Sequence, residues 1–415
     1  MIHKLFTLML LASASAGSTA AAADSSSVSV SPLTEQIYLL SVDEGSYTTN
    51  TLAFVGDDGL LLVDTQAEEY AEDLKKAVES FGRGVPAYIV NTHRHVEHIG
   101  GNALFGPGPV IIAHHLVPEK LRTGIFLFDE YPPEAYPDLV VYDSLRLFFN
   151  GDTIRLVDIS GSHDDNEIMV HFMNNKVVHL SSITNGFNFP SVDSDGDIFQ
   201  FDELVEKAMR LLPEDVVIVS GHNAPGRYDQ LQPYHDMIVK TTAIVRQGLA
   251  EGKDVAQMQT EKVLDEFKDY AGSYVSEDQW IKYLARALEP DSVRPSRNIY
   301  TSLYQTYKAD GAQAAADLFV DLKESQTTEY KINEYQLAVV GYRLSVKAKH
   351  ADAIPFFEGS LREYPEGAYN ALSAYYLATC HHELGDDGQA VVYCHKALEL
   401  NPEYEDARQL LEELE

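Results

Sequence analysis

The sequence predicts an α/β domain followed by an all-α helical domain. From residue 37 to about residue 175, β-rich runs alternate with turns and short helical patterns, whereas a spaced pattern of small residues recurs in the last quarter of the chain. Strands separated by helices are typical of sheets whose faces are covered by helices. Length is the third observation, because 415 residues exceed what one ordinary hydrophobic core supports.

In the first domain, the order of the elements leads from a hairpin to a histidine-rich loop. Apolar runs at residues 51–55 and 59–64 flank a Gly-Asp-Asp-Gly turn, which is typical of a β-hairpin. Residues 68–81 have the apolar spacing of an amphipathic helix, and the short apolar strand 87–91 runs directly into the histidines. Further strands are expected at residues 110–113, 145–149, 153–158, 168–172, 176–180 and 216–220, and helices from residue 231 to about residue 290.

The C-terminal part contains a repeat. Ala316, Ala353 and Ala390 follow one another at intervals of 37 residues, and Pro365 and Pro402 are separated by the same interval. This helix-pair repeat is slightly longer than the roughly 34 residues of a TPR, whose consensus the last copy resembles. We expect TPR-like helical repeats over residues 296–415, preceded by a helical extension or connection at 236–295. An ordinary helical bundle is the alternative for the tail.

The N-terminal segment has the three parts of a secretory signal. Lys4 precedes an apolar run at residues 5–12, and small residues follow as far as Ala23. We therefore expect a signal peptide over residues 1–23 and an exported protein, periplasmic or secreted. After this segment the sequence contains no run of about 18 apolar residues, so we expect no membrane span in the mature chain. In an oxidising compartment Cys380 and Cys394 could form one disulfide, or they could stay a buried reduced pair.

Composition and charge exclude some classes of protein. With 45% hydrophobic and 23% charged residues, the chain has the composition of a soluble globular protein. The 31 Lys and Arg against 64 Asp and Glu give a formal net charge of −33, which repels phosphate backbones at long range. Nucleic acid is therefore not expected as a partner.

A cluster of histidines carries the chemistry. His93, His95 and His98 lie within six residues immediately after an apolar strand. Zinc needs several nitrogen, sulfur or oxygen ligands at about 2 Å, and the ends of rigid strands are suited to presenting them. Three histidines at this spacing are not readily explained by packing, so the motif predicts a metal site.

At this point the sequence resembles the metallo-β-lactamase superfamily, whose hallmark is HxHxDH followed by Gly-Gly. Four segments carry the resemblance in the expected order, namely the strand that ends in Asp64, the motif at residues 93–102, the third-histidine segment at 161–167 and the Gly-His segment at 220–225. The resemblance implies a metallo-β-lactamase αββα sandwich over residues 30–235.

The resemblance also implies roles for individual residues. His93, His95 and His163 would hold one zinc, and Glu97, His98 and His222 would hold a second. Glu97 would orient or shuttle a proton if it is not a ligand. Asp64 would not bind the metal itself but would orient a ligand histidine or the motif loop. Four other histidines of the domain have packing or surface roles in this interpretation: His114, His115, His171 and His179.

Two departures from the family pattern concern the second zinc. Glu97 stands where the family usually has aspartate, and Ser182 occupies the position of an aspartate that bridges both metals in many hydrolases of this fold. A hydroxyl does not supply the charge of a carboxylate, so the second metal should bind more weakly. One or two zinc ions per chain are therefore expected.

The function that follows is zinc-dependent hydrolysis of a small-molecule substrate. Zinc lowers the pKa of a bound water towards about 7, and a metal-bound hydroxide would attack an ester, a lactone, an amide including a β-lactam, or a thioester. The alternative is a non-catalytic metal-containing module whose TPR-like tail recruits a protein partner. The aromatic, proline-rich segment at residues 123–137 is either a wall or lid over the metals or a local packing flap.

Overall fold

The computed structural model describes residues 27–415 except Ser46, residues 193–195, residues 289–297, Thr327, Thr328, Lys331 and Glu366. The expected signal peptide lies outside the described residues. The chain divides into two compact units. The first comprises Ala20–Glu119 and Pro132–Ser292, and the second comprises Lys120–Tyr131 and Val293–Glu415.

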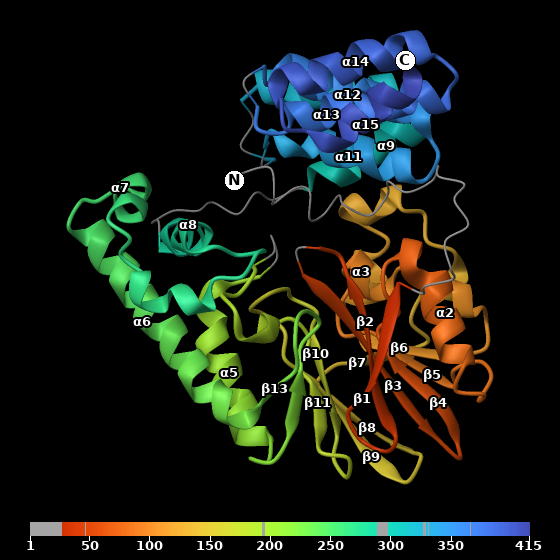
Figure 1. Ribbon diagram of the computed structural model, residues 1–415, viewed down its shortest axis with the longest axis vertical. Coiled ribbons are helices and arrows are strands. Elements are labelled where there is room, and N and C mark those ends of the chain that lie inside the picture. Colours follow the sequence, from red (N-terminus) through yellow and green to blue (C-terminus); the bar gives the residue numbers. More distant parts are fainter. Residues whose placement is uncertain are drawn as a thin grey trace. The chain divides into compact units, whose positions relative to one another are not determined.

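The first unit contains two sheets that face each other (Figure 1). The seven-stranded sheet has its strands in sequence order, antiparallel from β1 to β4 and parallel from β4 to β7. Its strands are β1 (Val28–Pro32), β2 (Ile37–Asp43), β3 (Thr48–Gly56), β4 (Gly59–Val63), β5 (Tyr88–Val90), β6 (Val110–His114) and β7 (Leu139–Val141). The expected hairpin is present as β3 and β4.

The six-stranded sheet has the order β13-β12-β11-β10-β9-β8. Only the β11–β12 pair among its described strands is parallel. Its strands are β8 (Ser144–Phe149), β9 (Asp152–Asp158), β10 (Ile168–Phe172), β11 (Val177–His179), β12 (Val217–Val219) and β13 (Gly226–Arg227).

Alternating side chains divide each strand between two cores. Successive residues of a strand point to opposite faces. On β4, Leu61 and Val63 join the core between the sheets, whereas Leu60 and Leu62 join the core on the outer face. The inner core combines residues of both sheets and includes the pair Phe54 and Phe172, whose ring centroids are 5.1 Å apart.

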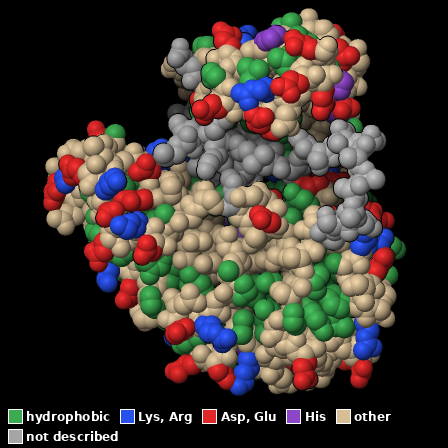
Figure 2. All heavy atoms as spheres, viewed as in Figure 1, with side chains coloured by type: hydrophobic (Ala, Val, Ile, Leu, Met, Phe, Trp, Pro, Cys, Tyr) green, Lys and Arg blue, Asp and Glu red, His purple; other side chains and the backbone are tan. Residues whose placement is uncertain are grey.

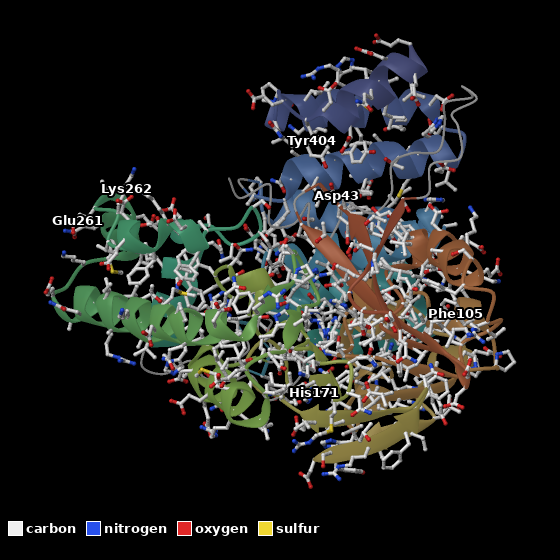
Figure 3. The ribbon with its side chains drawn as sticks, turned by 60° about the horizontal axis from the view of Figure 1, so that its bottom comes forward. Asp43, Phe105, His171, Glu261, Lys262 and Tyr404 are labelled. Atoms are coloured by element: carbon white, nitrogen blue, oxygen red, sulfur yellow. The ribbon has the colours of Figure 1, made fainter. Side chains whose placement is uncertain are left out.

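Helices cover both outer faces, which completes the αββα sandwich. The amphipathic helix α2 (Ala71–Glu79) packs on the seven-stranded sheet, together with Phe105, which Figure 3 labels. The other sheet is covered by α5 (Phe201–Leu211) and α6 (Leu231–Ala250), and α8 (Glu277–Leu288) packs on α6. Short helices complete this unit: α3 (Val96–Ile99), α4 (Val117–Lys120) and α7 (Val255–Thr260).

The second unit is helical, and its packed pairs include α9 with α10, α11 with α12 and α13 with α14, together with α12 on α13. Ala316, Ala353 and Ala390 are buried at corresponding places in the second helix of each pair. The helices are α9 (Ile299–Asp310), α10 (Ala312–Glu324), α11 (Tyr335–Val346), α12 (His350–Glu363), α13 (Asn370–Glu383), α14 (Asp387–Leu400) and α15 (Glu405–Leu414). The 37-residue interval therefore corresponds to helix pairs. Cys380 and Cys394 on α13 and α14 are buried free thiols.

The segment Lys120–Tyr131 belongs to this helical unit, although it lies far away in sequence. Phe128 is 1% exposed, and its ring packs against Tyr304, Tyr307 and Phe356. Asp129 forms an ion pair with Arg343. Of the two roles considered for the aromatic segment, this part of it therefore has the packing role.

Within the described part of the chain, no helix combines the length and the apolar character needed to cross a membrane. Acidic side chains are spread over the face drawn in Figure 2, with basic side chains between them. This distribution agrees with the formal net charge of −33.

Candidate metal centre

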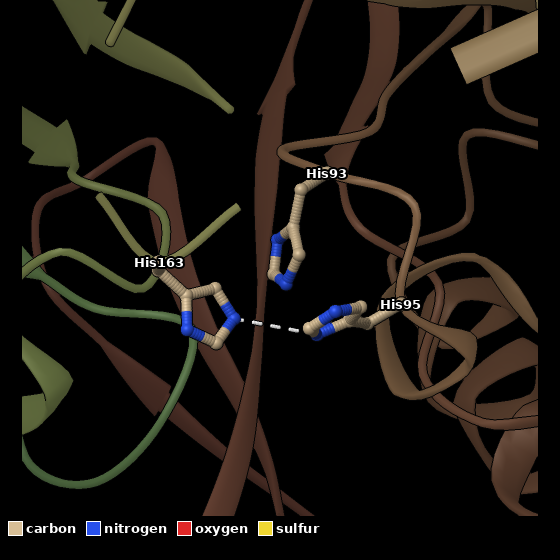
Figure 4. Close-up of side chains that lie close together, drawn as sticks. All are labelled: His93, His95 and His163. Atoms are coloured by element: carbon tan, nitrogen blue, oxygen red, sulfur yellow. Dashed lines mark hydrogen bonds between the residues drawn. The ribbon is translucent and has the colours of Figure 1, made fainter. Parts of the chain in front are cut away.

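Three histidines converge from two loops that follow the ends of inner strands of the two sheets. His93 and His95 lie in the turn between β5 and α3, and His163 lies between β9 and β10. One ring nitrogen from each lies within 4.8 Å of the others. Nε2 of His163 is 3.3 Å from Nδ1 of His95, the contact drawn in Figure 4. The three histidines that the resemblance assigns to one zinc therefore lie together and could hold a metal ion.

A second group lies beside the first. Glu97 and His98 come from α3, and His222 follows β12. The Nε2 atoms of His98 and His222 are 3.3 Å apart, and Oε1 of Glu97 is 3.9 Å from Nε2 of His222. The rings of His93 and His98 are 4.4 Å apart between centroids, so the two groups form one centre.

Hydrogen bonds to the Nδ1 atoms of His163 and His93 leave the Nε2 atoms of these rings directed at the centre. Nδ1 of His163 lies 3.0 Å from the carbonyl oxygen of Ser191, and Nδ1 of His93 lies 3.1 Å from Oγ1 of Thr92. Nε2 of His93 is buried and has no hydrogen-bond partner among the described residues. A buried nitrogen left without a partner is costly in free energy, and a metal ion would satisfy it.

Asp64 holds the motif loop and one histidine together. It follows β4 with φ of 67°, a left-handed conformation that aspartate tolerates better than most residues. Its carboxylate accepts hydrogen bonds from the backbone nitrogen and Oγ1 of Thr92, at 2.7 and 2.8 Å, and lies 2.9 Å from Nδ1 of His98. The geometry agrees with the orienting role that the resemblance implies.

The electrostatics of the centre favour neutral rings at His93 and His222 and an ionised carboxylate at Glu97. Burial and the neighbouring His98 hold the pKa of His93 well below its usual value, and the same two causes lower the pKa of His222 to about 3. Burial acts to raise the pKa of Glu97, but the nearby His95 and His98 outweigh it and lower this pKa to about 2. Neutral imidazole and carboxylate are the forms that bind metal ions.

Ser182 lies close to His98 of the second group, and its side chain is a hydroxyl, not a carboxylate. Its side chain is fully buried, and its Oγ has no hydrogen-bond partner among the described residues. A Cβ added to Gly221 would lie 2.8 Å from Cε1 of His98 and 3.0 Å from Oγ of Ser182, so these groups approach one another closely around the glycine. The backbone nitrogen of Ser182 donates a hydrogen bond of 3.1 Å to the buried carboxyl of Glu167.

The sequence interpretation missed several residues that support the ligands. Asp164 lies 3.2 Å from Nε2 of His95 and 3.0 Å from Nη2 of Arg94, with its carboxylate fully buried. Its position directly after His163 was a usable signal. Ser191 had no such signal, because it is 28 residues from the histidine that it contacts.

Four other histidines of the sandwich lie outside the candidate metal centre. His171 on β10, labelled in Figure 3, and His179 on β11 are buried within the six-stranded sheet. His114 ends β6, and His115 stacks on Tyr142 at 4.4 Å between ring centroids. Neither of the two groups found in the described residues includes any of these four.

An αββα sandwich with histidine clusters at one edge of its sheets defines a class of metal-binding proteins. Residues 45–222 match the family model described as "Metallo-beta-lactamase superfamily". The chain therefore contains a metallo-β-lactamase superfamily domain.

Three solved structures are similar to this chain. A metallo-beta-lactamase from Pontibacter korlensis is 16% identical, with coverage of 51% of this chain and 98% of that chain and a TM-score of 0.45. The DIM-1 metallo-beta-lactamase is 17% identical, with coverage of 52% and 98% and a TM-score of 0.43. VMB-1 is 15% identical, with coverage of 52% and 99% and a TM-score of 0.44.

Proposed function

We propose that the protein is a zinc-dependent hydrolase of a small ester, lactone, amide or thioester. The observation that carries the proposal is the convergence of five histidines and one carboxylate, with Nε2 of His93 buried and without a hydrogen-bond partner among the described residues. Imidazole and carboxylate suit zinc among the common divalent ions. The donor set therefore fits the metal.

Each group of the centre has a distinct part in this proposal. A bound zinc would supply a Lewis acid and would lower the pKa of a coordinated water towards about 7. His93, His95 and His163 would hold the first ion, and Glu97, His98 and His222 the second. Glu97 is ionised at neutral pH, so it can either bind metal or accept a proton from the attacking water. Asp64 would keep Nε2 of His98 directed at the centre.

We further propose that the second ion is held less tightly than the first. Ser182 supplies no charge at the place where many hydrolases of the fold have a bridging aspartate, so fewer anionic ligands offset the repulsion between two cations. We also propose that residues 1–23 direct export and that the helical unit is TPR-like and recruits a protein partner. The recurring helix pairs support this last part.

The proposal is tested by metal analysis together with turnover on chromogenic lactam, ester and thioester substrates. His93→Ala and His163→Ala should lose zinc and activity together. His395→Ala is the matched control, because this histidine is exposed on α14. Full-length protein that retains zinc but turns over none of the substrates would favour the non-catalytic module, and equal turnover after removal of the zinc would refute the proposal.

A further inference from the structure

Backbone hydrogen bonds join the segment that contains His222 to the first residues of β3. Thr49 and His222 are paired residues of an isolated antiparallel bridge. On either side of the bridge, the nitrogen of Asn50 donates to the carbonyl oxygen of Gly221 at 2.8 Å, and the nitrogen of Asn223 donates to that of Thr48 at 3.0 Å. Directly opposed residues of an antiparallel pair have neighbouring side chains. The backbone thus places the hydroxyl of Thr49 beside the ring of His222.

That hydroxyl connects His222 to a carboxylate. Oγ1 of Thr49 donates a hydrogen bond to Oε1 of Glu44 and lies 3.5 Å from Nδ1 of His222. A threonine hydroxyl has a single proton. Since that proton is directed at Glu44, the hydroxyl can accept from the ring only when the proton of His222 is on Nδ1, and the backbone of Thr48 is a further hydrogen-bond partner of the ring. Nε2 of His222 then has a free lone pair, and this is the atom that lies 3.3 Å from Nε2 of His98.

The carboxylate is itself held in place. Glu44 follows Asp43, the last residue of β2, which Figure 3 labels. The hydroxyl of Tyr47 donates to Oε2 of Glu44 at 3.1 Å, and the backbone nitrogen of Glu44 donates to the carbonyl oxygen of Tyr47 at 2.9 Å. The Tyr47 ring also meets the His222 ring edge-on, at 4.8 Å between centroids. The turn between β2 and β3 therefore positions both Glu44 and the ring that it acts on.

We infer that Glu44, acting through Thr49, is a positioning residue that holds His222 in its Nδ1-protonated form and so sets the metal affinity of the second group. The inference rests on the proposed function only for the assignment of His222 as a ligand. In this arrangement each histidine of the second group has its own carboxylate, Asp64 directly for His98 and Glu44 through a hydroxyl for His222. Partners of this kind typically change metal affinity about 10–100-fold when they are removed.

The test measures zinc binding by the full-length protein in competition with a chromogenic chelator. Thr49→Val, which keeps the shape and removes the hydroxyl, should weaken the second zinc equivalent about 10–100-fold and leave the first unchanged. Thr49→Ser should restore the affinity. Thr51→Val is the control, because this buried threonine on the same strand accepts a hydrogen bond from Gln66 instead. Glu44→Gln provides a second variant if Thr49→Val does not fold.

A second measurement is independent of metal and of catalysis. Side-chain ¹⁵N NMR of the metal-free protein should show the proton of His222 on Nδ1, with a shift towards the Nε2-protonated form in Thr49→Val or Glu44→Gln. Unchanged ring protonation together with unchanged affinity for the second zinc would overturn the inference. Absence of turnover in a native protein that shows both effects would contradict the proposed hydrolase and leave the role of Glu44 intact.

Discussion

The carboxylate of Asp64 lies 2.9 Å from Nδ1 of His98, and both side chains are completely buried. The same carboxylate accepts two hydrogen bonds from Thr92, the residue before His93. One buried group thus fixes the ring of a second-group histidine and the backbone that leads into the first group. A loss of its charge should therefore affect both groups.

Asp64→Asn tests this relationship with little change in shape. Asparagine tolerates the left-handed conformation that Asp64 adopts, so the backbone should stay in place. The amide is uncharged, so it gives His98 a weaker partner, and we expect zinc affinity to fall about 10–100-fold. Chelator competition measures the effect, with Asp57→Asn in the exposed β3–β4 turn as the control. Equal affinities of the native protein and the Asp64→Asn variant would show that Asp64 does not support the metal centre.

Ser182→Asp should change metal binding and stability in opposite directions. A carboxylate at this buried position would add charge beside His98, so the second zinc should bind more tightly. Without metal, the same buried charge lies near the carboxyl of Glu167 and should lower the free energy of unfolding.

Denaturant unfolding with and without zinc, together with metal analysis, checks both parts of the Ser182 prediction. Ser182→Asn, of the same size but uncharged, separates charge from bulk. The reasoning from lost charge would be wrong if the native protein already retained two zinc ions through dialysis against a chelator.

The buried carboxyl of Glu167 predicts a pH dependence of stability. Burial raises its pKa to about 7, despite an opposing hydrogen bond from Ser181. The unfolded chain therefore loses this proton near pH 4.5, whereas the folded protein keeps it until about pH 7. The contribution of the protonated Glu167 to the free energy of unfolding is therefore fully present below pH 4.5. It is lost as the pH rises to 7, and the loss amounts to about 3 kcal/mol in total.

Glu167→Gln should flatten this part of the pH profile. The measurement is denaturant unfolding of metal-free protein at several pH values across this window, and the exposed Glu214→Gln is the control. An unchanged slope in Glu167→Gln would mean that another group controls the pH dependence.

Much of the fold and many residues of the candidate metal centre could be predicted because their signals are local in sequence. Alternating apolar residues mark β4, and His93, His95 and His98 follow a strand at a fixed spacing. The motif order also indicated Asp64 and His222, which are far apart in the chain. Glu44 and Thr49 were missed, because their part depends on a bridge between β3 and a segment 173 residues away, and no spacing in the sequence records that pairing.

The packing partners of Phe128 also could not be predicted from the sequence. Its aromatic, proline-rich surroundings indicated either a wall or lid over the metals or a local packing flap. Burial of a phenylalanine is favourable in any apolar core, so composition does not say which core receives it. Only the fold shows that Tyr304, Tyr307 and Phe356 surround it.

This packing predicts the outcome of a truncation near Arg294 that removes the C-terminal helices. Removal of the helices would leave Lys120–Tyr131 attached to the sandwich without its packing partners. Phe126 and Phe128 would be uncovered, and Asp129 would lose Arg343. We expect this simple truncation to aggregate, because the exposed aromatic side chains form a new apolar surface.

A second truncation separates this effect from the metal centre. Replacing residues 120–131 by a Gly-Ser linker of the same length, in addition to removing the helices, should restore solubility. This variant should bind zinc and turn over small substrates as the full-length protein does, because all six candidate ligands lie in the sandwich unit. Size-exclusion chromatography and metal analysis compare the two truncations. Loss of zinc from a soluble, linker-containing truncation would show that the centre requires the helical unit.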